Sequence, residues 1–66
     1  MTQRERLLAL LAEFGITPAP VEDFEMRDPH DVVVAAKHGG VEGYSGFECV
    51  FTFDAEGRFV CVGVWE

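Results

Sequence analysis

The stretch FECVFTFDAEGRFVCVGVWE, residues 47–66, has the pattern of two strands joined by a tight turn. Asp54 begins the turn and Gly57 ends it, which is typical of a type I turn followed by a left-handed residue in a β-hairpin. β-Branched and aromatic residues dominate both flanks, as they do in strands. We therefore predict strands over about residues 47–53 and 58–65.

Counting outward from this turn predicts which side chains share a face of the sheet. Strand side chains alternate between faces, so a pairing of Asp54 with Arg58 places Phe53 opposite Phe59. The face that contains this pair is then apolar throughout: Phe47, Cys49, Phe51, Phe53, Phe59, Cys61, Gly63 and Trp65. We expect this face to receive a helix. We also expect both cysteines to be reduced and buried there, at diagonal positions too far apart for a disulfide.

The opposite face of the hairpin is also mainly apolar, with Glu48 as its charged residue. Its other members are Val50, Thr52, Val60, Val62 and Val64. A continuous apolar run over residues 32–36 indicates a strand that is covered on both faces. Monomers rarely expose an apolar patch of this extent. We therefore predict that these five residues form a self-association face, most simply in a two-fold dimer.

The N-terminal segment predicts a helix over about residues 2–14. Thr2 and Glu5 have the spacing of a capping box, and leucines recur at helical intervals up to Phe14. Gly15 is placed to end the helix in a left-handed conformation. Prolines within residues 17–20 prevent continuation and indicate a stiff linker.

The middle of the chain contains a third predicted strand, at about residues 31–37, and a segment at 21–26 that fits either a short edge strand or an extended crossing. The Gly-rich stretch that follows leaves two interpretations open. It is a wide hairpin loop, or it is a ligand loop in which backbone amides hold an anion and Tyr44 stacks on a nucleotide-like molecule. The residues of this possible ligand loop are His38, Gly39, Gly40, Gly43 and Tyr44. Known phosphate loops lead from a strand into a helix, whereas this one leads into a strand.

Together these elements predict a single α+β domain over residues 1–66. We expect an N-terminal helix packed on a three- or four-stranded, mainly antiparallel sheet. A chain of 66 residues builds a small core, so additional support such as self-association is expected.

The composition argues against several classes of function. Twelve acidic and five scattered basic residues give a net charge of -7, which disfavours binding to nucleic acid or to an anionic membrane. No metal-ligand spacing, cofactor motif or nucleophile–base pattern is present, so we predict neither metal, cofactor nor catalytic residues. No long apolar run indicates a membrane span, and a cytoplasmic location is expected.

Four short motifs in the C-terminal third resemble small accessory proteins of actinobacterial phages and prophages: residues 43–47 (GYSGF), 51–54 (FTFD), 57–59 (GRF) and 63–66 (GVWE). The resemblance implies expression in the host cytoplasm and binding to host components. The leading hypothesis is therefore a non-enzymatic binding module that binds or blocks a host protein. The alternatives are a nucleotide-like ligand sponge that uses the Gly-rich loop and an acidic DNA mimic.

Overall fold

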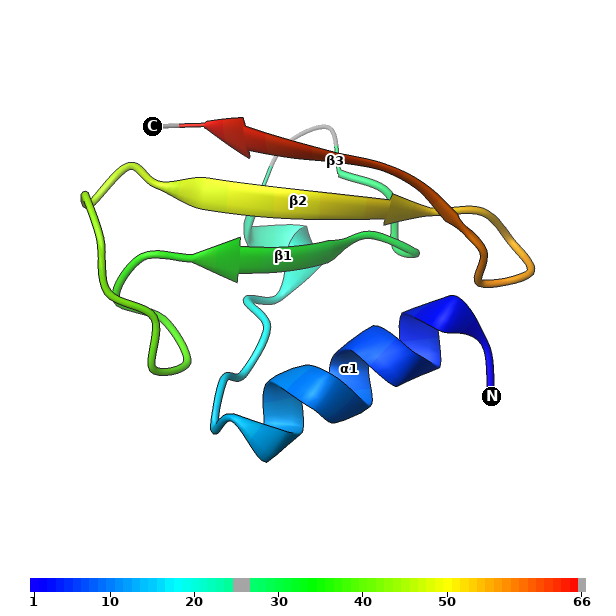
Figure 1. Cartoon of the computed structure of the whole chain (residues 1–66). Helices are drawn as coiled ribbons and strands as arrows, with labels where there is room; N and C mark the ends of the chain where they lie inside the picture. Colours follow the sequence, from blue (N-terminus) through cyan, green and yellow to red (C-terminus); the bar gives the residue numbers. More distant parts are fainter. Residues whose placement is uncertain (25–26, 66) are drawn as a thin grey trace.

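The computed structural model describes residues 1–24 and 27–65, which form an α-helix packed against a three-stranded antiparallel sheet (Figure 1). Helix α1 spans Gln3–Glu13, and the strands are β1 (Val32–Ala35), β2 (Glu48–Phe53) and β3 (Phe59–Trp65). β2 lies between β1 and β3. The predicted α+β class is confirmed, with three strands.

The segment predicted as an edge strand or crossing at 21–26 contains a short 3-10 helix, η1, over Val21–Asp23. Residues 25 and 26 of that segment lie outside the described residues.

Helix α1 has both of the end signals that the sequence predicts. The Thr2 hydroxyl accepts a hydrogen bond from the Glu5 N–H at 3.1 Å, and the Glu5 carboxylate accepts one from the Thr2 N–H at 2.8 Å. Gly15 has a φ of 74°, and the Ile16 N–H donates to the Leu11 carbonyl at 2.8 Å. The capping box and the left-handed glycine therefore determine where the helix begins and ends.

The hairpin turn also forms as predicted, with Gly57 at a φ of 78°. The Asp54 carboxylate accepts hydrogen bonds from the backbone N–H groups of Glu56 and Arg58, both at 2.9 Å. Phe53 pairs with Phe59, as the predicted register requires.

Beyond that first pair the predicted register is wrong, because the pairing shifts between Thr52 and Phe53. Thr52 pairs with Cys61, which leaves Val60 as the extra residue of a β-bulge. A shift of one residue moves each later β3 side chain to the other face. Val62 therefore lies opposite Phe51.

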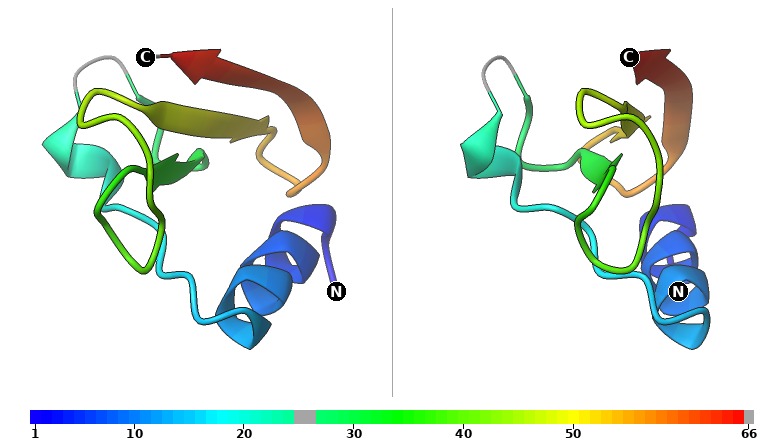
Figure 2. Two further views of the ribbon diagram at one scale, coloured as in Figure 1. Left: turned by 60° about the vertical axis from the view of Figure 1, so that its left-hand side comes forward. Right: turned by 90° about the vertical axis from the view of Figure 1, so that its left-hand side faces the viewer.

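The shift defines the two faces of the sheet. We call the side that carries Cys49, Phe51, Phe53, Val62 and Val64 the helix face. The opposite side, which carries Val50, Thr52, Cys61, Gly63 and Trp65, is called the linker face. In Figure 2, α1 and the segment that contains η1 lie on opposite sides of the sheet.

The linker face is covered by the segment after α1. Ala19, Val33 and Val50 form a buried cluster, against which Val21 and Phe24 pack. The Ala19 N–H donates to the Val33 carbonyl at 2.8 Å, which fixes this segment along the outer edge of β1. The predicted linker is thus a structural cover for the sheet.

Helix α1 docks less deeply than its leucine pattern predicts. None of its residues is fully buried, and Leu10 and the following Phe14 are 50% and 72% exposed. Polar contacts attach its first turn to the hairpin: the Arg4 N–H donates to the Gly57 carbonyl at 3.0 Å, and the Gln3 side chain accepts from the Phe59 N–H at 2.7 Å.

The Gly-rich loop holds the chain just beyond the other end of α1. The Thr17 N–H donates to the Gly39 carbonyl at 3.0 Å. Gly39 and Gly40 have φ values of 62° and 87°, and a Cβ on Gly39 would collide with the Thr17 backbone. These two glycines therefore allow a close approach between two backbone segments.

We predict that Gly39→Ala destabilises the protein more than Gly15→Ala does. Both residues have positive φ, which costs an alanine about 1–2 kcal/mol. A Cβ on Gly15 meets no atom within 4 Å, whereas one on Gly39 meets the Thr17 backbone. Urea unfolding of both variants checks this, and equal losses of stability would contradict the packing role of Gly39.

Candidate functional site

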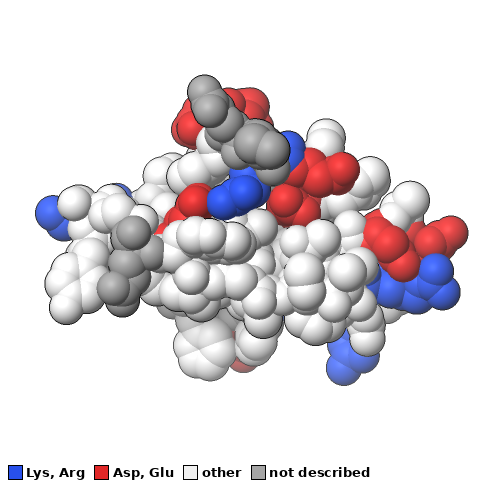
Figure 3. All heavy atoms as spheres, turned by 90° about the horizontal axis from the view of Figure 1, so that it is seen from above, with Lys and Arg blue, Asp and Glu red and all other residues white. Residues whose placement is uncertain are grey.

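Strand β3 exposes large apolar side chains on both faces of the sheet. Phe59, Val60, Val62, Val64 and Trp65 are each 47–61% exposed. The strand contains no charged residue over its whole length, Phe59–Trp65. Figure 3, which looks down onto the sheet from the β3 side, shows uncharged surface across most of the view and charged groups gathered at the hairpin turn and along the upper border. Such a surface is a candidate for protein contact.

The predicted self-association residues do not share one face. Val60, Val62 and Val64 are exposed, but Val50 is only 3% exposed because the Ala19 segment covers it. Thr52 is half-buried on the same linker face as Val50. The bulge at Val60 is the physical reason, because it moves Val62 and Val64 to the helix face. Val50 is therefore a core residue of this chain and is not available to a second chain.

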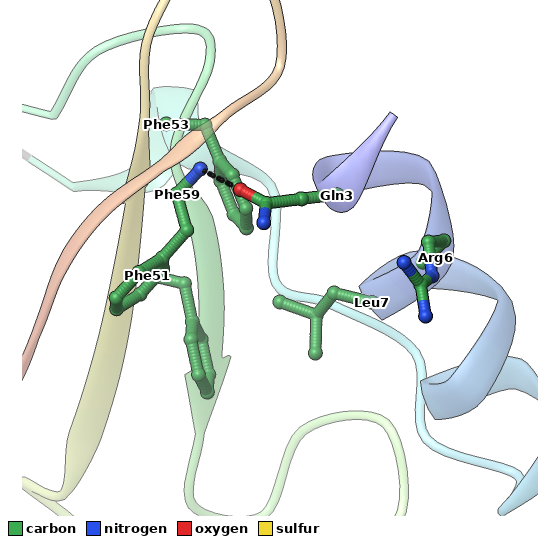
Figure 4. Close-up of a pocket in the computed structure, with 6 residues that line it drawn as sticks. All are labelled: Gln3, Arg6, Leu7, Phe51, Phe53 and Phe59. Atoms are coloured by element: carbon green, nitrogen blue, oxygen red, sulfur yellow. Dashed lines mark hydrogen bonds between the residues drawn. The ribbon is translucent and has the colours of Figure 1, made fainter. Parts of the chain in front are cut away.

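A groove of about 440 Å³ lies between α1 and the hairpin (Figure 4). The helix contributes Gln3, Arg6 and Leu7, and the hairpin contributes Phe51, Phe53 and Phe59. Leu7 reaches from the helix across the gap toward the sheet. The groove exists because α1 is attached at its first turn while its leucines stop short of full burial.

The walls of the groove are held in place by direct contacts. The rings of Phe53 and Phe59 meet edge to face, with centroids 6.1 Å apart and planes at 72°. The hydrogen bond from the Phe59 N–H to Gln3 ties the helix wall to the hairpin wall. Both walls are therefore defined before any partner binds.

The chemistry of the groove is apolar contact with one cation. Of the described residues that line it, Arg6 is the ionisable one, and it makes no ion pair within the described part of the chain. A carboxylate from a partner could therefore pair with the Arg6 guanidinium without competing with a partner inside the chain. The sequence pattern did not reveal this groove, because it depends on how far the helix stands from the sheet.

The possible ligand loop lies away from the groove, and none of its residues lines it. Tyr44 is 73% exposed, and His38 and Gly43 are exposed as well. Gly39 and Gly40, in contrast, contact the chain that follows α1. Ligand binding at this loop stays a prediction.

A cation–carboxylate pair that the sequence analysis missed lies beside the C-terminal end of β3. The Arg27 guanidinium binds the Glu48 carboxylate at 2.9 Å and lies 5.0 Å from the centre of the Trp65 ring. Both charged side chains are 19% exposed. The pair joins the chain before β1 to the start of β2, and the separation of 21 positions between its partners explains why no local pattern predicts it.

The histidine and acidic residues of the 28–31 turn form local hydrogen bonds. The His30 N–H donates to the Asp28 carboxylate at 2.8 Å, and the His30 ring lies 2.7 Å from the same carboxylate. These bonds lower the pKa of Asp28 below its usual value. Within residues 1–24 and 27–65, no cluster of three His, Cys, Asp or Glu side chains is arranged to hold a metal ion.

The two cysteines lie on opposite faces of the sheet, contrary to the predicted register. Cys49 is half-buried on the helix face, and burial raises the pKa of its thiol. Cys61 pairs with Thr52 on the linker face and is exposed. The prediction that both thiols are buried is therefore wrong for Cys61, again because of the bulge.

In comparisons with known proteins, no protein-family model, curated protein or solved structure matches the chain. Among the described residues, no helix has the length and apolar character needed to cross a bilayer.

We predict that Cys61 reacts with a thiol reagent in the native protein well before Cys49 does. Cys61 is exposed, and the raised pKa of the half-buried Cys49 leaves it with less of the reactive thiolate. Mass spectrometry of peptides after timed alkylation measures both rates. Equal rates, or labelling of both cysteines only after denaturation, would instead support the register predicted from the sequence, in which both thiols are buried on one face.

Proposed function

We propose that the chain is a non-enzymatic binding module of phage origin that binds a host protein in the groove between α1 and the hairpin and thereby blocks it. The observation that carries this proposal is the composition of the groove. Leu7 and three phenylalanines form its apolar walls, and Arg6 is its cation. Concave apolar sites with one charged group are typical of protein anchors.

The chemistry of the groove specifies the partner segment. An apolar side chain, aromatic or leucine, fits between Leu7 and the phenylalanine rings. A carboxylate next to that side chain pairs with Arg6 and orients the segment. We therefore infer that the partner presents a bulky apolar residue beside an acidic one.

The nucleotide-like ligand alternative has less support from the contacts of the Gly-rich loop. Gly39 and Gly40 are engaged with the chain that follows α1, which occupies part of the backbone that an anion would need. The exposed Tyr44 is the feature in its favour. The groove offers more apolar contact than this loop does.

We predict that Leu7→Ser weakens partner binding while Leu10→Ser does not. Both leucines lie on α1, but Leu7 lines the groove and Leu10 does not. Loss of a buried leucine contact of about 1.5–3 kcal/mol corresponds to roughly 10- to 150-fold in affinity. Peptides selected from a random display library on the wild-type protein supply the ligands, and calorimetry with each variant supplies the affinities.

Peptides that also bind the Leu7→Ser variant are discarded, which leaves the peptides that depend on the groove. We expect these peptides to share a bulky apolar residue beside an acidic one, and to bind Arg6→Glu more weakly. A host-cell lysate then supplies the natural partner, which should be retained by the wild type and by Leu10→Ser but not by Leu7→Ser. Peptides without that pair of residues, or equal retention on both serine variants, would contradict the proposal.

A further inference from the structure

The outer edge of β3 is the longest unpaired strand edge in the described sheet. β1 lies at the other edge, where Ala19 pairs with Val33. Proteins protect exposed edge strands with charged residues, prolines or a covering segment. The seven residues of β3 include neither a charge nor a proline. An edge of this kind is suited to pairing with another strand.

The hydrogen bonds of the sheet identify which backbone groups point outward from β3. The Val33 carbonyl accepts from Ala19, so the backbone of Val33 faces away from β2. Val33 pairs with Val50, and Val50 pairs with Gly63. Because hydrogen-bonded and open pairs alternate along an antiparallel ladder, Val50 bonds to Gly63, and the residues on either side of Gly63 face outward. These residues are Val62 and Val64.

The beginning of the same edge is already occupied. The outward N–H of Phe59 donates to the Gln3 side chain, and the bulge follows at Val60. The regular, open part of the edge therefore consists of residues 62–64. Their two outward residues supply two N–H donors and two carbonyl acceptors.

We propose that a second copy of this chain pairs with the outer edge of β3. The two β3 strands run antiparallel, with Val62 of each copy opposite Val64 of the other and a two-fold axis at Gly63. Four hydrogen bonds then join the copies, and the two sheets become one six-stranded sheet. This interface uses residues 62–64, which do not line the groove, so its test does not depend on the proposed function.

Three properties favour a second copy as the occupant. The edge is self-complementary and uncharged, and antiparallel pairing separates the two charged hairpin turns to opposite ends. The accessible surface of the chain is 4608 Å², compared with about 4,200 Å² expected for a folded monomer of 7.3 kDa. The apolar core is also small, with Ala19, Val32, Val33, Val50 and Phe53 as its buried members in the described chain. Both properties favour association with a partner, and a second copy is present wherever the chain is made.

Amide hydrogen exchange of the wild-type protein, followed by NMR, tests this proposal directly. The Cys61 and Gly63 amides face β2 and serve as internal controls that exchange slowly. We expect the Val62 and Val64 amides to exchange as slowly as these controls, and light scattering to give twice the chain mass at the same concentration. A monomeric mass, or a dimer in which Val62 and Val64 exchange at unprotected rates, would overturn the proposal.

A pair of variants separates strand pairing from general apolar contact. Val62→Pro removes the outward N–H, and an outward-facing position on an edge strand accommodates proline. Val62→Thr keeps the N–H and the β-branched shape. We expect Val62→Pro to weaken association roughly 30-fold (about 2 kcal/mol for two lost hydrogen bonds per dimer), and Val62→Thr to retain the dimer. Equal association of the two variants would contradict edge pairing, and the exchange measurement on the wild type stands even if the proline variant unfolds.

Discussion

The bulge at Val60 determines how the apolar residues of this chain are divided between the two faces of its sheet. Without it, Cys61 and Trp65 would lie with the phenylalanines, and Val62 and Val64 would lie on the linker face with Val50. The single extra residue reverses this arrangement. Val50 remains under Ala19, and Trp65 lies near the Arg27–Glu48 pair. The bulge therefore decides which β3 side chains join the helix face and which join the linker face.

The sequence predicts local structure well because the relevant signals are local. Thr2 and Glu5 specify the helix start, Gly15 specifies its end, and Asp54 and Gly57 specify the hairpin turn. Each of these residues acts through hydrogen bonds or dihedral angles within a few positions of itself. The α+β class follows from these elements together.

The features that the sequence does not predict depend on contacts between distant segments. Val60 is an ordinary β-branched residue, so nothing in its type indicates a bulge. The cover of the linker face by Ala19 depends on a contact with Val33, and the depth of the groove depends on where α1 rests. The pattern of leucines indicates which side of α1 is apolar, but it does not indicate that this side is only partly buried. Locating the candidate site therefore required the structure, although its leucine and phenylalanines are recognisable in the sequence as apolar positions.

The attachment of the chain on both sides of α1 has a consequence for how the groove can open. The hairpin binds the first turn of the helix through Gln3 and Arg4, and the Gly39 carbonyl binds Thr17 just after the helix. Because the helix is held near both of its ends, it cannot rotate away from the sheet about either end. Two backbone attachments therefore hold the helix beside the sheet, together with its half-buried leucines Leu7, Leu8 and Leu11. An incoming side chain meets walls that are already in position, so little conformational entropy is lost on ordering the helix during association.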